Sequence, residues 1–169
     1  MNDKVFSDTG PLIHLSEIEA VEALDIFDII NVPTPVVREL RKRDLPGSNI
    51  MIQEKFMGIS TTDEDRILSQ TLTREHSMSL NDSLILASAV NGKTELILTD
   101  DLEIREISMG YNIKPVGTIG ILLRAFREGI ISLEELLTKV QSIQDVSSLF
   151  ITEDLVDEVI GSAKGFDKK

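Results

Sequence analysis

The chain has no cysteine, no tryptophan and a single tyrosine, and aromatic residues make up only 4% of its 169 residues. Without cysteine it can form no disulfide framework, no thiolate zinc site and no cysteine nucleophile. The two histidines, His14 and His76, do not share a metal-ligand spacing with acidic residues, which argues against zinc or histidine-based chemistry. We therefore expect a protein of a reducing compartment, the cytoplasm. We also expect His14 to be a packing residue of a helix.

Long apolar runs are also missing. No stretch approaches the ~18 uninterrupted apolar residues that a membrane-spanning helix needs. The first residues, MNDKVFSDTG, lack the basic and apolar regions of a signal peptide. We expect a soluble protein that has no membrane partner.

Basic residues are scarce. The chain has 17 Lys and Arg against 29 Asp and Glu, which gives a net charge of −12. At long range this charge repels nucleic acid, so phosphate chemistry would require a local basic patch or bound metal cations. Residues 128–169 hold nine acidic and only four basic residues, and we expect this segment to face away from any polyanion.

The length and the 41% hydrophobic content are sufficient for one compact domain. Strand-like segments alternate with helical segments, which predicts an α/β fold with a parallel sheet covered by helices. The expected strands are residues 4–7, 28–32, 57–60, 95–99 and 113–116. After residue 129 the pattern is helical, with no further strand signal.

Several helices have local start signals. Apolar residues recur every third position from Leu12 to Leu24, which predicts one helix or two short helices broken near Ser16. The expected capping boxes are Thr62 with Asp65 and Ser132 with Glu135. The segment after Ser79, LNDSLILASAVN, is apolar on most sides and is expected to be a buried helix.

Acidic residues follow the strands of the predicted sheet. Asp8 ends the first strand, and Asp100 and Asp101 follow the apolar segment ELILT. Binding sites in open parallel sheets form at the carboxyl ends of the strands, so these acids are expected at one rim. Glu39 and Asp82 lie near the starts of helices that face the same rim. Clustered carboxylates repel one another unless they share protons or bind hard cations, so the pattern predicts a Mg²⁺ or Mn²⁺ site.

Each of these acids also has a purely structural interpretation. The structural interpretations are an N-cap at Asp8, a Ser79–Asp82 capping box, a helix cap at Asp100 or Asp101, and a Glu39–Arg43 pair. Caps alone do not readily place four acids in order, one after each sheet-forming unit. The joint placement therefore favours a site.

Four segments around the acids resemble the PIN-domain pattern: SDTGPLIHL, PTPVVREL, LNDSLILASA and LILTDDLEIRE. The later segment GTIGILLRAFREGII is similar to the C-terminal part of a PIN subgroup. The resemblance implies a PIN-like fold with a central parallel sheet of about four or five strands flanked by helices. It also implies a PIN-like nuclease domain at 1–128, with a helical C-terminal extension at 129–169 packed on the same domain.

The resemblance further implies a Mg²⁺- or Mn²⁺-dependent endoribonuclease that hydrolyses phosphodiester bonds of RNA. The matching catalytic and metal residues are Asp8, Glu39, Asp82 and Asp101. Asp100 remains a competitor for the fourth metal position, because the Asp100–Asp101 doublet leaves open which carboxylate faces the metal. Thr9 is expected to help hold the pocket.

Many PIN-domain proteins are VapC-type toxins, so the implied role is the toxin of a VapBC-type toxin–antitoxin pair. An antitoxin partner and a homodimer are expected with it. The alternative is a catalytically silent PIN-like module that binds protein or RNA. The apolar stripe within residues 149–160 is expected to be core or a dimer contact, with an antitoxin groove as the other possibility.

One dense basic cluster stands next to Glu39. Its members are Arg38, Arg41, Lys42 and Arg43. They are candidate RNA-binding residues, because phosphate contacts need cations on one side of a helix, but a solvated helix face explains them equally well. Arg124 and Arg127 are possible additions to the same track.

Overall fold

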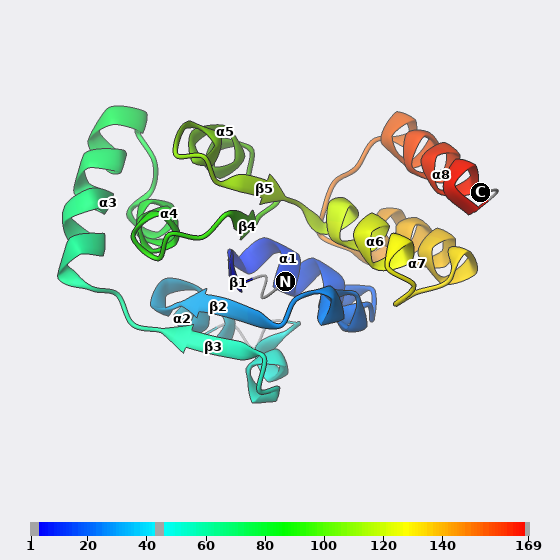
Figure 1. Ribbon diagram of the computed structural model, residues 1–169, viewed down its shortest axis with the longest axis horizontal. Coiled ribbons are helices and arrows are strands. Elements are labelled where there is room, and N and C mark those ends of the chain that lie inside the picture. The colour runs from blue at the N-terminus through cyan, green and yellow to red at the C-terminus, as the bar shows by residue number, and fades with distance from the viewer. Residues whose placement is uncertain (1–3, 43–45, 168–169) are drawn as a thin grey trace.

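The computed structural model describes residues 4–42 and 46–167, and the described chain forms an α/β fold (Figure 1). Its sheet has five parallel strands in the order β3-β2-β1-β4-β5. The strands are β1 (Lys4–Ser7), β2 (Ile29–Pro33), β3 (Phe56–Ile59), β4 (Leu96–Leu98) and β5 (Lys114–Val116). The predicted α/β class and parallel sheet are confirmed.

The strands differ slightly in length from the predicted ones. β4 has three residues, whereas the apolar run predicts five. Backbone pairing nevertheless continues past both of its ends, because Lys114 donates its N–H to Glu95 O (2.8 Å) and Thr99 donates its N–H to Val116 O (3.0 Å). This pairing carries the ladder to the residue that precedes the acidic doublet.

Helices cover the sheet and extend beyond it. The helical segments are α1 (Thr9–Glu17), η1 (Val21–Ile26), α2 (Thr34–Lys42), η2 (Ser48–Ile52), α3 (Asp63–His76), α4 (Leu80–Asn91), α5 (Leu102–Gly110), α6 (Thr118–Arg127), α7 (Leu133–Val146) and α8 (Glu153–Asp167). Figure 1 shows α3 and α4 at one end of the molecule and α6, α7 and α8 gathered at the other, with the sheet between them.

The apolar periodicity near the N-terminus belongs to two short helices, α1 and η1. The chain turns between them at Glu19, which has a positive φ of 53°, and Ala20 donates its N–H to Leu15 O (2.7 Å). The break falls after Glu17, a little later than the predicted position. The predicted capping boxes are also present, at the starts of α3 and α7.

The central strands and α4 form the core. Val5, Ile30 and Ile97 are completely buried on the three central strands, which matches the continuous apolar sequences of buried parallel strands. On α4, Leu86 and Ala89 are also completely buried, as the all-round apolar sequence predicts. Burying each side chain the size of Leu or Ile stabilises the fold by about 1.5–3 kcal/mol.

Hydrogen bonds connect the C-terminal helices to the end of α1. Lys139 on α7 donates from Nζ to Ile18 O (3.2 Å) and Glu19 O (2.5 Å), while Glu17 accepts hydrogen bonds from Ser147 and Ser148. Helix α8 packs with α6 and α7 and buries part of the predicted apolar stripe. Within the described ranges, none of the helices combines the length and the apolar character that crossing a bilayer requires.

Candidate functional site

Asp8 lies where β1, β4 and α1 meet. Its backbone N–H donates to Leu98 O (2.8 Å), and its side chain caps α1 by accepting from the Thr9 N–H (2.6 Å). The other carboxylate oxygen accepts from Thr99 Oγ1 (2.9 Å). The residue is buried, so the predicted N-cap role and a role in a site are both compatible with its position.

The electrostatic surroundings of Asp8 connect it to two other predicted site residues. Burial, with smaller contributions from the negative charges of Asp82 and Asp101, raises the pKa of Asp8 to about 6, although the hydrogen bonds from Thr9 and Thr99 oppose the rise. A like charge raises the pKa of a carboxyl only when it lies within electrostatic reach of that carboxyl. Asp82 and Asp101 therefore lie close enough to Asp8 for their charges to act on it.

Thr99 joins two of these acids through one hydroxyl. Its Oγ1 donates to Asp8 Oδ2 and accepts from the Asp101 N–H (3.2 Å), and the residue is fully buried. Asp101 in turn caps α5, since its Oδ1 accepts from the Ile104 N–H (2.9 Å). The cap predicted for the doublet thus belongs to Asp101.

Glu39 reaches the site from α2. Thr9 Oγ1 donates to Glu39 Oε2 (2.8 Å), so the residue after Asp8 links the first helix to the second. This hydrogen bond is the contact through which Thr9 can help to hold the pocket. The alternative partner of Glu39, Arg43, lies outside the described residues.

Asp82 lies in the first turn of α4, which begins after the predicted cap Ser79. The Ser79 hydroxyl accepts from the Asp82 N–H (3.1 Å) and donates to Asp82 Oδ2 (2.5 Å). The second bond of a reciprocal capping box would run from the Ser79 N–H to the carboxylate; here the carboxylate accepts from the serine hydroxyl instead. This contact holds the Asp82 carboxylate at the N-terminal end of α4.

Asp100 points away from its neighbour in the doublet. Its Oδ2 accepts from His14 Nδ1 (2.8 Å) and Thr118 Oγ1 (2.6 Å), and its Oδ1 accepts from the Thr118 N–H (2.7 Å). Burial alone would raise the pKa of Asp100, but the hydrogen bonds from His14 and Thr118 outweigh it and hold the pKa below its usual value. Asp100 is therefore an ionised carboxylate that three hydrogen bonds hold in place.

His14 and Thr118 have no counterpart among the predicted site residues. His14 was expected to pack as an apolar-face residue, whereas its ring hydrogen-bonds to a carboxylate 86 positions away. No local spacing rule connects residues that far apart. The usable signal was the doublet itself, because two adjacent acids at one strand end cannot both face the same way.

The donor chemistry of the site suits a hard divalent cation. Asp8, Asp82 and Asp101 offer only carboxylate oxygens, and their mutual repulsion is the kind that a bound cation relieves. As the side chains stand, no three Asp, Glu, His or Cys residues within residues 4–42 and 46–167 lie close enough together to hold an ion. The residue types fit a cation, and coordination would require side-chain rotation.

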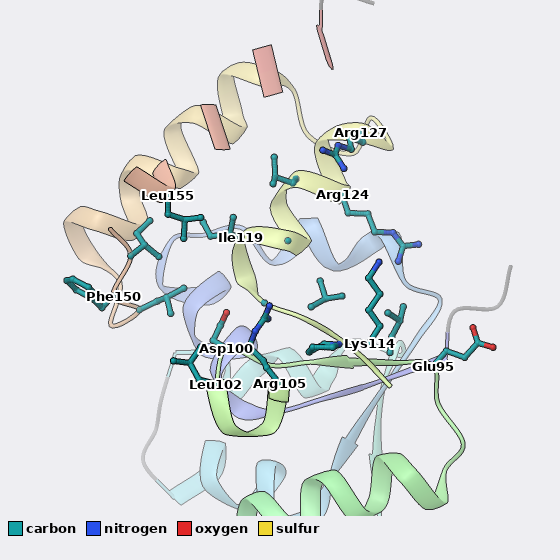
Figure 2. A pocket seen from close by; sticks show the side chains of 18 of the residues that line it. Glu95, Asp100, Leu102, Arg105, Lys114, Ile119, Arg124, Arg127, Phe150 and Leu155 are labelled. Atoms are coloured by element: carbon teal, nitrogen blue, oxygen red, sulfur yellow. The ribbon is translucent and has the colours of Figure 1, made fainter. Parts of the chain in front are cut away.

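A groove lies next to Asp100 (Figure 2), and Asp8, Asp82 and Asp101 are not among the residues that line it. It has a volume of about 1250 Å³ and runs between α5, β5, α6 and the segment before α8. Asp100 is the only predicted site acid that borders it. Figure 2 shows Asp100 near Arg105 at one end of the groove, Lys114 toward the other end, and Arg127 on α6.

The predicted basic cluster is partly described. Arg38 and Arg41 are exposed on α2 and line a small surface hollow with Thr34 and Val37. Lys42 is the last residue of α2, and Arg43 lies outside the described residues. Arg124, considered as an addition, is instead paired with Glu128 and lies over the ring of Phe27.

Taken together, the chain is a parallel α/β protein with acidic residues converging at the carboxyl edge of its sheet. A family model described as the PIN domain matches residues 4–165, and the chain belongs to this family. PIN domains have a nuclease-type fold, and the match extends through α7 and most of α8. No curated protein matches the chain.

Proposed function

We propose that the protein is a Mg²⁺- or Mn²⁺-dependent endoribonuclease. The observation that supports this most directly is the environment of Asp8, a buried carboxyl whose pKa is raised to about 6 by burial and by the charges of Asp82 and Asp101. Groups with strongly shifted pKa values concentrate at functional sites. Membership of the PIN-domain family supplies the reaction class.

In this proposal Asp8, Asp82 and Asp101 hold the cation, and Glu39 is held toward it by Thr9. When bound, the cation lowers the pKa of a water molecule and neutralises charge at the scissile phosphate. Asp8 acts as a ligand in its ionised form, so protonation of its carboxyl competes with cation binding. Thr99 keeps Asp8 and Asp101 in a fixed relation through its single hydroxyl.

The proposed biological role is that of the toxin in a VapBC-type toxin–antitoxin pair. In this role the protein is a cytoplasmic homodimer that an antitoxin controls. In this proposal the nuclease domain spans 1–128 and the extension at 129–169 packs on it. The RNA-binding residues in this proposal are Arg38 and Arg41, together with Lys42 and Arg43 of the basic cluster in the sequence. The acidic C-terminal helices would face solvent or a partner.

Asp→Asn substitutions in purified protein test the nuclease. We expect the wild type to cleave single-stranded RNA in the presence of Mn²⁺, and we expect Asp8→Asn and Asp82→Asn to lose at least ~100-fold in rate because each removes a ligand. Asp154→Asn, an exposed position on α8, is the matched control and should cleave normally. Full activity in the two site variants would show that the site is wrong. Absence of cleavage by the wild type would favour the silent binding module.

A further inference from the structure

The carboxylate of Asp100 accepts three hydrogen bonds from two residues of other elements. His14 and Thr118 provide three donors at 2.6–2.8 Å, and only 13% of the Asp100 side chain is exposed. An ionised carboxylate can only accept, so His14 carries its proton on Nδ1. A carboxylate engaged in this way has little freedom to turn toward a cation.

The start of α6 is built around this carboxylate. Gly117, the N-cap residue of α6, makes no side-chain cap, and the orphan N–H of Thr118 is satisfied by Asp100 instead. A Cβ at Gly117 would lie 2.6 Å from Asp100 Oδ1, so glycine is what permits the close approach. A negative charge at a helix N-terminus is also favourable.

The same carboxylate connects the elements that carry the proposed metal ligands. His14 is on α1, whose N-cap is Asp8, and Asp100 directly precedes Asp101 in the turn between β4 and α5. Asp101 has the opposite character: it is exposed, and its charge acts on Asp8. The two acids of the doublet therefore have distinct surroundings.

We propose that Asp100 is a positioning residue and that Asp101 alone of the doublet is a ligand. Together with His14 and Thr118, Asp100 holds α1 and the β4–α5 turn in register, so that Asp8 and Asp101 meet at one cation. The inference rests on the proposed metal-dependent function. Residues that orient metal ligands typically contribute about 10–100-fold to metal affinity.

Titration of the whole metal-free protein with Mn²⁺, following free Mn²⁺ by EPR, separates a ligand from a positioning residue. We expect Asp101→Asn to lose Mn²⁺ affinity by more than ~100-fold, and Asp100→Asn and His14→Leu to lose about 10-fold each. The His14→Leu/Asp100→Asn double variant should bind no more weakly than Asp100→Asn, because both changes break one link.

Two further variants control for loss of packing. His14→Asn places an amide N–H where Nδ1 stands and should restore binding to within about threefold of the wild type, because the donor to Asp100 returns. His76→Leu changes the other, exposed histidine and should leave binding unchanged. Unfolding temperatures recorded without metal identify any variant that fails to fold.

Three results would overturn the proposal. The first is a loss of Mn²⁺ affinity in Asp100→Asn as large as that in Asp101→Asn, together with normal affinity in His14→Leu. This result would make Asp100 a ligand. Another is a fall in unfolding temperature for His14→Leu and Asp100→Asn with unchanged Mn²⁺ affinity, which would make the link purely structural. Absence of Mn²⁺ binding by the wild-type protein would overturn the metal site itself. The wild type is therefore titrated before any variant is compared with it.

Discussion

The buried carboxyl of Asp8 makes the free energy of unfolding depend on pH. Its pKa is about 6 in the folded protein and near 3.8 when the side chain is freely solvated. The folded state therefore binds the Asp8 proton more tightly than the unfolded state does, and this group makes the metal-free protein less stable as pH rises from about 4 to above 6. The direction is opposite to that of an acid in an ion pair.

Asp8→Asn should remove this destabilisation. In EDTA we expect the variant to exceed the wild type in free energy of unfolding at pH 7.5 by up to about 3 kcal/mol, since each pKa unit corresponds to 1.36 kcal/mol. The difference should shrink toward pH 4, where the wild-type carboxyl is protonated. Urea unfolding at the two pH values measures it, with Asp154→Asn as control. A variant equally destabilised at both pH values would contradict the expected burial of charge.

At the scale of elements, one ammonium group donates two of the hydrogen bonds that attach α7 to the end of α1. Lys139→Met keeps an unbranched apolar stem but leaves the carbonyls of Ile18 and Glu19 without the Nζ donor. We expect a loss of about 1.5–3 kcal/mol in free energy of unfolding, because hydrogen bonds to charged groups fall in that range.

Urea unfolding of Lys139→Met, compared with Lys164→Met on the exposed side of α8, provides the measurement. Mn²⁺ affinity should not change, because Lys139 pairs with Glu22 and with backbone carbonyls rather than with Asp8, Asp82 or Asp101. If the two variants unfold alike, the bond between α7 and α1 contributes nothing measurable.

Elements with local signals were the ones that could be predicted. The caps at Thr62, Ser79 and Ser132 were visible because a cap and its partner lie three residues apart. The gathering of Asp8 and Asp101 was also predictable, since parallel strands end at one edge. The bond between His14 and Asp100 was not, because it depends on how α1, β4 and α6 pack, and no period or spacing encodes that packing.

At the scale of the whole molecule, the net charge of −12 sets the conditions under which RNA can bind. The exposed cations Arg38 and Arg41 lie on the helix that carries Glu39, while nine acidic residues lie within 128–169. Binding would thus combine a short attractive track with a repulsive remainder. Such an arrangement predicts modest affinity that falls steeply with salt.

Salt titration of RNA binding tests this arrangement. For single strands the slope of log affinity against log salt is about −0.7 per phosphate contact, so two to four contacts predict a slope of about −1.4 to −2.8. Arg38→Ala/Arg41→Ala should weaken binding and make the slope shallower by about 1.4, because two contacts are lost. Fluorescence anisotropy with a labelled single-stranded RNA, in an Asp8→Asn background that prevents cleavage, gives both quantities.

The matched control for this experiment is Arg74→Ala/Lys93→Ala, which removes two exposed cations from α3 and from the turn after α4. Both double variants change the net charge equally, so the overall field affects them alike, and only a local track distinguishes them. An equal loss of affinity in the two would mean that RNA senses the net charge alone. A slope near zero in the wild type would remove phosphate contacts from the proposal and direct attention to base stacking, for which exposed Phe150 at the groove is the first position to substitute.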